Sequence, residues 1–254
     1  MKTIVRTKMY RVYMARLAFR LTVFAIVLAF YLYNKELLYV LVTHPIYMGF
    51  RPFHFLWLIF MMIMLRHIFP GGRRSMALRK AEEVNFQKVE GYSEFELLKF
   101  VQRQNVRAWT VMLIWLGLNA VFGTLYLLHI LDEADLLMLT VFFFLCDYIC
   151  ILFFCPFQTF VMKNKCCVNC RIYDWGHFMM FTPMLFIRNF FSWSLFFTSL
   201  VVLLHWEIIY ALHPERFWSG SNKTLQCANC KDKTCQLKNR ISQSLGGKTP
   251  PPVQ

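Results

Sequence analysis

Residues 135–161 read DLLMLTVFFFLCDYICILFFCPFQTFV, a long stretch of mostly apolar side chains. After Asp135, which opens the stretch, Asp147 is its only charged residue. A helix needs roughly 20 consecutive apolar residues to cross the hydrocarbon core of a bilayer. The stretch is longer than that, and no turn residue divides it before Pro156. It therefore predicts a transmembrane helix, which places this chain among membrane proteins.

Four further segments have the length and composition of spans: 17–33, 53–69, 108–131 and 190–212. Hydrophobic residues make up 57% of the chain, more than a soluble domain usually contains. Two shorter apolar pieces, 37–50 and 175–187, contain Pro45 and Pro183 and read as interfacial or re-entrant helices. The prediction is an all-α, polytopic integral membrane helical bundle of about 5–6 transmembrane helices, with one or two short Pro-broken helices.

The distribution of charge predicts the orientation in the membrane. Residues 1–20 carry six Lys or Arg and no acid, and the 70–107 loop carries eight Lys or Arg. The 132–135 turn, Asp-Glu-Ala-Asp, is acidic and falls on the opposite side. Because basic loops are retained in the cytoplasm, we expect a multi-pass protein of the cell membrane with a cytoplasmic N-terminus.

These features divide the chain into seven parts. A capping box formed by Ser93 and Glu96 predicts that an amphipathic helix on the inner leaflet begins there and leads into the third span. The predicted parts are a basic cytoplasmic N-terminus (1–16), membrane helices 1 and 2 (17–69), a cytoplasmic loop with that amphipathic helix (70–107), membrane helices 3 and 4 (108–161), a Cys-rich loop (162–174), a broken helix with the last span (175–218), and a Cys-containing polar tail with a disordered end (219–254).

The formal net charge of +14 does not indicate nucleic-acid binding. The basic residues lie beside membrane spans, where sorting of positive charge and anionic headgroups account for them. No RNA- or DNA-binding motif is present. The expected partner is therefore the lipid bilayer, and a membrane protein partner or a homo-oligomer is left open.

Two Cys-x-x-Cys turns carry the clearest chemical signal. Cys167 and Cys170 form one (CVNC), Cys227 and Cys230 form the other (CANC), and both lie in basic polar segments. Two such turns supply the four thiolates of a tetrahedral metal site. The first hypothesis is therefore a four-cysteine site that joins the loop to the tail, with three further thiols in reserve: Cys166, Cys235 and Cys155.

Zinc is the favoured metal for such a site, because paired CxxC turns are common in zinc ribbons and ferredoxin spacing is absent. An iron–sulfur cluster is the alternative cofactor. A second hypothesis is membrane thiol–disulfide or quinone-linked redox chemistry at one CxxC pair. Lys163, Lys165 and Arg171 around CVNC, and Lys223, Lys231 and Lys233 around CANC, would stabilise thiolates.

Asp147 supports a third hypothesis, a small permease that uses this acid and the Pro-broken helices. A carboxylate near the centre of a span is costly unless it faces the bundle and finds a partner. The expected partner is Asn119 of the third span or Arg188, and the competing interpretation is that the pair only holds helices together. Cys146 and Cys150, one turn apart beside it, are expected to pack as small apolar side chains.

Sequence motifs do not indicate an enzyme class. The chain contains no GxSxG, P-loop, GxGxxG or HExxH pattern, so enzymatic activity is left undecided. A strict five-span map places the two CxxC pairs on opposite faces of the membrane. The basic tail argues against that map, and a re-entrant limb before Arg188 would return the tail to the inner face. We therefore expect the two pairs to meet.

Overall fold

The structure is a computed structural model, and it describes residues 7–36, 38, 51–69, 76–164, 166, 169–230 and 238. Regular structure in these residues is helical, apart from one isolated bridge between Lys88 and Asn222. The longer helices are α1 (Lys8–Tyr33), α3 (Pro52–Ile68), α5 (Glu94–Leu127), α6 (Glu133–Leu152) and α8 (Phe190–Leu212), and the shorter ones are α4 (Met76–Ala81) and α7 (Gly176–Phe181). The predicted all-α class is confirmed.

Four helices in the described residues are long and apolar enough to cross a membrane: Tyr10–Tyr33 within α1, α5, α6 and α8. The predicted span 53–69 corresponds to α3, whose 17 residues extend about 25 Å at about 1.5 Å per residue. It is shorter than the roughly 30 Å hydrocarbon core. Of the predicted 5–6 spans, four are therefore supported by helices that are long and apolar enough to cross a membrane. Helix α3 is a shorter apolar helix.

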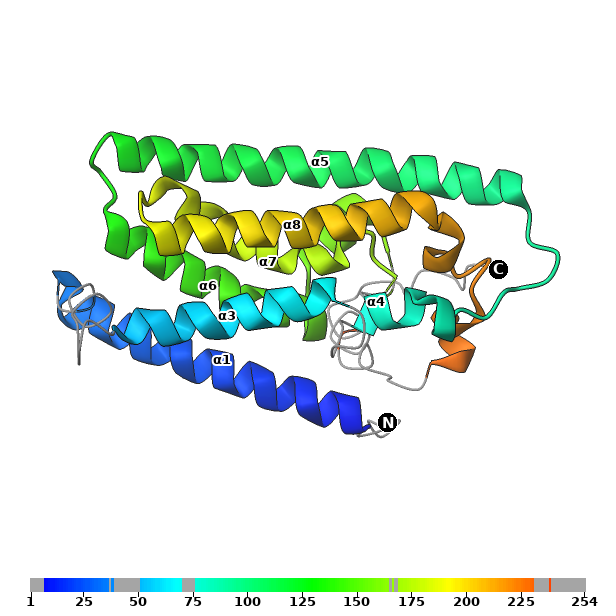
Figure 1. The fold of residues 1–254 in the computed structure, drawn as a ribbon, viewed down its shortest axis with the longest axis horizontal. Coiled ribbons are helices and arrows are strands. Elements are labelled where there is room, and N and C mark those ends of the chain that lie inside the picture. Colours follow the sequence, from blue (N-terminus) through cyan, green and yellow to red (C-terminus); the bar gives the residue numbers. More distant parts are fainter. Residues whose placement is uncertain are drawn as a thin grey trace.

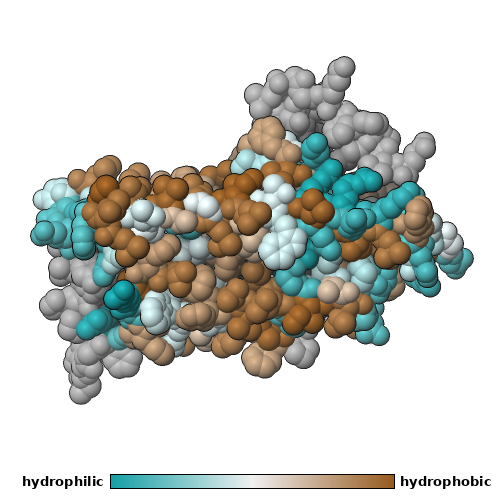
Figure 2. Space-filling model, turned by 90° about the horizontal axis from the view of Figure 1, so that it is seen from above, coloured by the Kyte–Doolittle hydropathy of each residue, from teal (hydrophilic) through white to brown (hydrophobic). Residues whose placement is uncertain are grey.

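Apolar and polar surfaces are separated along the long axis. Figure 2 shows a hydrophobic belt over the middle of the molecule, between hydrophilic residues at its two ends. This distribution suits a protein whose belt faces lipid and whose ends face water. The belt contains many exposed large apolar side chains, among them Trp109 and Leu113 on α5 and Phe197 on α8.

The helices form a bundle in which the last span returns the chain to the end where α1 begins (Figure 1). Helix α1 packs against α6, α3 packs against α8, and α7 packs against both α6 and α8. A short helical turn at Thr182–Phe186 follows α7 directly, and Pro183 within it is buried. The predicted break in 175–187 is therefore present, and it lies inside the bundle. The other short piece, 37–50, lies almost wholly outside the described residues.

Helix ends follow local sequence signals, with one correction at the end of α6. Ser93 caps α5 as predicted, because its Oγ accepts the backbone N–H of Glu96 at 3.4 Å. The expected surface helix and third span are one continuous helix of 34 residues, since no Gly or Pro interrupts 94–116. Helix α6 ends at Leu152 rather than at residue 161. Pro156 has no N–H to continue the ladder, and its ring would clash with the preceding turn.

The end opposite the start of α1 is acidic, and it is neutralised locally. Lys35, just past α1, lies 2.8 Å from Asp132 and 2.7 Å from Asp135 at the start of α6. Tyr31 donates a hydrogen bond to Asp135 at 2.5 Å. The acidic 132–135 turn lies at the end of the bundle opposite the start of α1 (Figure 1).

Candidate functional site

The CxxC segments lie in a polar assembly at one end of the bundle. We call it the basic cap and define it as residues 76–92, 169–175 and 213–230. Asn222 fastens its two long segments together, and it is fully buried. Its side-chain amide donates to the carbonyls of Lys80 at 3.2 Å and Arg216 at 2.8 Å. Backbone bonds from Val89 to Ser221 and from Lys223 to Gln87 complete the junction.

The loop that carries CVNC touches the segment that leads to CANC. Asn169, the third residue of CVNC, donates its side-chain amide to the carbonyl of Leu225 at 3.1 Å. Both residues, with Cys170, line a small cavity of about 10 Å³ beneath α4 and the end of α8. The short helices within 175–187 lie inside the bundle, and α8 after them returns the chain to the side of the CVNC loop. The two segments therefore meet at one end of the molecule, and the meeting of the two CxxC pairs themselves stays a prediction.

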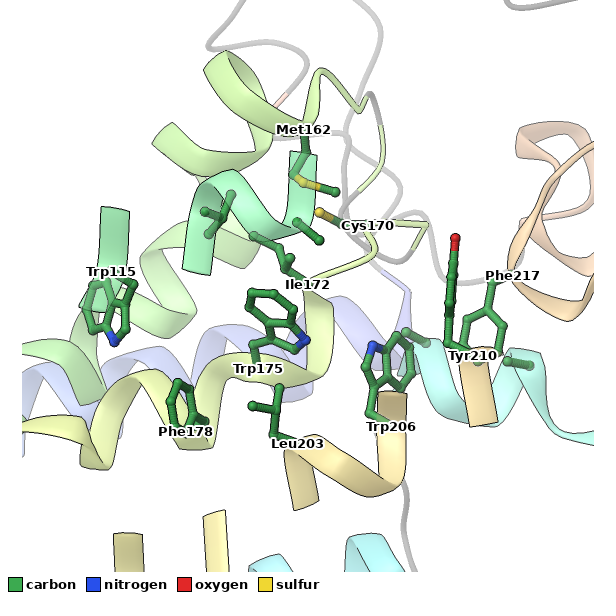
Figure 3. Close-up of a cluster of buried hydrophobic side chains, with 14 of the residues drawn as sticks. Trp115, Met162, Cys170, Ile172, Trp175, Phe178, Leu203, Trp206, Tyr210 and Phe217 are labelled. Carbon is green, nitrogen blue, oxygen red and sulfur yellow. The ribbon is translucent and has the colours of Figure 1, made fainter. Parts of the chain in front are cut away.

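The cysteines of these segments have different surroundings. Cys170 is buried, and Figure 3 shows its sulfur facing Met162 within an apolar cluster. Cys227 is exposed, and Cys230 is half-buried with its Sγ 3.8 Å from the Lys80 ammonium. Cys166 packs against the same cluster as Cys170. Cys167 and Cys235 lie outside the described residues.

Within the described part of the chain, no three His, Cys, Asp or Glu side chains converge as metal ligands would. The seven cysteines that it covers are free of disulfides. Cys155, a predicted reserve ligand, accepts the backbone N–H of Gln158 through its Sγ at 3.4 Å. The structure brings together the two segments that carry the CxxC turns, through the bond from Asn169 to Leu225.

Arg171, the residue after Cys170, forms the most enclosed ion pair of the basic cap. Its Nη1 donates to Oε1 of Glu207 on α8 at 2.6 Å, and its Nη2 contacts Oε2, so the pair is bidentate. Trp175 donates its indole N–H to the same carboxylate at 2.8 Å. The Arg171 side chain is 7% exposed. Such two-point pairing fixes orientation as well as distance.

Two aromatic residues of α8 hold the backbone and side chain of Arg171 in place. Trp206 donates its indole N–H to the Arg171 carbonyl at 2.9 Å. The guanidinium carbon lies 3.7 Å from the ring centre of Tyr210, a cation–π contact. Figure 3 shows Trp206, Tyr210 and Phe217 side by side near the end of α8. The position of the CVNC loop is thus determined by α8.

Asp147 is paired with Arg20, which is not one of its expected partners. Its Oδ2 lies 2.8 Å from Nη1 of Arg20 on α1. The guanidinium also lies over the rings of Phe144 and Tyr148, with its carbon 4.0 and 3.9 Å from their centres. The expectation that Asp147 pairs with Asn119 or Arg188 is therefore wrong. Arg20 lies within the predicted span 17–33. A charge inside an apolar span is the sequence signal that could have identified it as the partner of Asp147.

Asn119 and Arg188 lie elsewhere for identifiable reasons. Asn119 is 2% exposed, and its amide donates to the Trp115 carbonyl one turn earlier in α5. Helix α5 packs mainly against the turns at 157–162 and 182–186, so it does not face Asp147. Arg188 precedes α8 and is exposed. Neither residue contributes to the Asp147 site.

Gly176 seals the other side of the Asp147 carboxylate. A Cβ built at this position would lie 2.7 Å from Asp147 Oδ1. Next to it, the His177 ring centre lies 5.1 Å from that of His67 on α3. These two histidines are 110 residues apart in the chain, so no local sequence motif pairs them. The junction of α1, α3, α6 and α7 is thus polar inside.

We expect Gly176→Ala to lower the free energy of unfolding by about 1–3 kcal/mol, because the added methyl must push against Asp147 and a packed core resists such insertion. Gly117→Ala is the matched control. That position on α5 has open space around its Cβ, and the change should leave stability equal or up to about 1 kcal/mol higher. Unfolding of both variants in detergent micelles measures the difference. Equal stabilities would show that α7 does not pack closely on Asp147.

Comparisons with known proteins found no relative of this chain. No model of a protein family, no curated protein and no solved structure matches this chain. Its class, a helical protein with several helices of membrane-spanning length, therefore follows from the sequence and the fold.

Proposed function

We propose that this chain is a multi-pass membrane protein whose basic cap binds one soft metal ion, zinc in the first place, through the thiolates of Cys167, Cys170, Cys227 and Cys230. The observation that carries the proposal is the bond from Asn169 to Leu225 at 3.1 Å. It joins the segments of the two CxxC turns, and four thiolates in two such turns are the common donor set of structural zinc. The ion would fasten the tail to the CVNC loop.

The surroundings of the cap suit thiolate ligands. Arg171 adjoins Cys170, and Lys80 lies 3.8 Å from the Cys230 sulfur. Positive charge favours the deprotonated thiols that bind metal. Cys170 would have to turn from Met162 toward the tail, and metal affinity can drive this, because a metal site need not be preformed before the ion binds. An iron–sulfur cluster on the same thiols is the alternative cofactor.

The same proposal places the protein in the cell membrane with its N-terminus and the basic cap in the cytoplasm. Residues 1–20, which carry six Lys or Arg and no acid, lead into α1 at the end of the bundle where the cap lies, and the acidic 132–135 turn lies at the other end. Retention of basic segments on the inner side supports this orientation. Reduced thiols, which metal binding needs, are the rule in that compartment. The bilayer is the partner that the exposed apolar belt supports.

Metal analysis of the purified full chain tests the proposal. We expect about one zinc ion per chain in the wild type and its loss in the Cys227→Ser/Cys230→Ser variant, since two of four ligands are then absent. Cys146→Ser is the matched control, because Cys146 lies on α6 away from the cap, and it should keep the metal. Thermal unfolding of the apolar bundle shows that each variant is folded.

Two results would overturn the metal proposal. One is a wild-type protein without zinc or iron. The other is labelling of Cys227 and of the 163–170 loop from opposite sides of the membrane, because a shared site needs both on one side. Reductant-dependent switching of the CxxC thiols without metal would favour redox chemistry at these pairs. Loss of transport in Asp147→Asn with metal retained would favour the permease hypothesis.

A further inference from the structure

The outward face of helix α3 forms an open groove over its last two turns. Four described residues line this groove of about 420 Å³: Met62, Leu65, Arg66 and Phe69. They are spaced at i, i+3, i+4 and i+7, so they follow one face of the helix. The opposite face is covered, because Met64 is fully buried in a cluster that includes residues of α8. The groove therefore faces away from the bundle.

Three of the four lining side chains, Met62, Leu65 and Phe69, are large, apolar and exposed. Exposed apolar residues of this kind suit contact with hydrocarbon in a molecule that carries a hydrophobic belt (Figure 2). The volume of the groove falls within the usual range of ligand sites, roughly 300–1,000 Å³. The groove can therefore accept part of an acyl chain.

Arg66 adds one positive charge to this otherwise apolar groove. It lies in the last turn of α3, where the negative end of the helix dipole favours a cation. Its side chain is exposed, and no carboxylate of the described residues forms an ion pair with it. The next residue, His67, faces the bundle interior, against His177. The Arg66 guanidinium is thus available for two-point hydrogen bonding to a phosphate.

The length of α3 brings lipid headgroups toward Arg66. Its 17 residues extend about 25 Å, against a hydrocarbon core of roughly 30 Å. A bilayer thins locally around a helix that is shorter than its core. Helix α3 ends toward the end of the bundle where α1 begins, and residues 1–20, with six Lys or Arg and no acid, lead into α1 there (Figure 1). Basic residues at a membrane surface attract anionic headgroups.

These observations together point to a lipid site: we propose that the groove binds one anionic phospholipid, with its phosphate on Arg66 and an acyl chain along Met62, Leu65 and Phe69. An anionic lipid is favoured over a zwitterionic one, because its headgroup carries no cation to offset the attraction of the phosphate for Arg66. Anionic lipids are enriched in the cytoplasmic leaflet, where the proposed orientation places this end of α3. The inference rests on the membrane placement in the proposed function and is independent of its metal site.

Native mass spectrometry of the purified full chain in detergent tests the site. The protein is titrated with phosphatidylglycerol and, separately, with phosphatidylcholine of the same acyl chains. We expect the first phosphatidylglycerol to bind about fivefold more tightly than the first phosphatidylcholine, the contribution of one basic residue at an anionic surface. In Arg66→Gln the two lipids should bind equally. Leu65→Ser should weaken both lipids alike, because it removes apolar contact and keeps the charge.

Arg11→Gln is the matched control, because Arg11 is an exposed arginine in the first turn of α1, outside the groove, and its loss should keep the preference. Excess inorganic phosphate should not displace the lipid, since the acyl chain also holds it. Equal binding of the two lipids to the wild type, a preference that survives Arg66→Gln, or displacement by phosphate would overturn the lipid site. In a chain that enters lipid nanodiscs, such a result refutes this site alone. A chain that stays outside nanodiscs refutes the membrane placement as well.

Discussion

Replacing Glu207 with Gln should lower the free energy of unfolding by about 3 kcal/mol, the lower end of the effect of removing one partner from a buried ion pair, because Arg171 is buried and Glu207 is 30% exposed. The positively charged Arg171 side chain is 7% exposed, so little water can solvate it. Without the carboxylate it would keep only the cation–π contact with Tyr210 and a single amide acceptor. Unfolding of the purified protein in mixed micelles measures the effect.

A second pair of variants separates loss of the charge from loss of packing. In Arg171→Met/Glu207→Leu both charges are removed, so most of the stability should return, since well-packed apolar residues often replace a buried pair without loss. Glu96→Gln is the control, because the Lys99–Glu96 pair is on the surface and should change stability within about 0.5 kcal/mol. If Glu207→Gln behaves like this control, Arg171 is not held by Glu207.

The Glu207 prediction also connects the bundle to the proposed metal site. Arg171 directly follows Cys170, and Trp206 and Glu207 of α8 hold its backbone and side chain. Loosening this anchor should expose Cys170 to alkylation and weaken zinc binding by the full chain. The two CxxC segments would then be joined only through contacts such as Asn169 to Leu225. The contacts through which α8 stabilises the bundle are therefore the same contacts that position the CVNC loop.

Several features could be predicted from the sequence because they depend on neighbouring residues. The N-cap at Ser93 and the break near Pro183 are local signals, and both are present. Membrane-length helices follow from apolar composition over roughly 20 residues. The return of the chain to the end where α1 begins followed from the charge of the tail together with the short limb 175–187. In each case the sequence pattern itself contains the physical cause.

Features that depend on which helices pack together could not be predicted in the same way. The need of Asp147 for a partner was evident, but identifying Arg20 requires knowing that α1 packs against α6. The Arg171–Glu207 pair likewise depends on the return of α8.

Replacing Arg20 with Met should lower the free energy of unfolding by about 3 kcal/mol or more, because Asp147 then has no cationic partner inside an apolar bundle. Asp147→Asn should have a smaller effect. Arg20 would keep its hydrogen bond to the Phe144 carbonyl and its contacts with two aromatic rings. Arg11→Gln is the matched control on α1, since Arg11 is exposed and should be nearly neutral.

The double variant Arg20→Met/Asp147→Leu decides between packing and transport. If the pair holds α1 to α6, removing both charges should restore most of the stability, with a coupling energy between the two sites of about 0.5–3 kcal/mol. If Asp147 is a transport residue, the double variant should fold and yet lose all solute or proton movement that the wild type shows in vesicles. The two rings that hold the Arg20 guanidinium support the packing role, because they restrict the motion that a transport cycle would require of this pair. A wild-type vesicle flux that depends on Asp147, with stability unchanged in Arg20→Met, would contradict that conclusion.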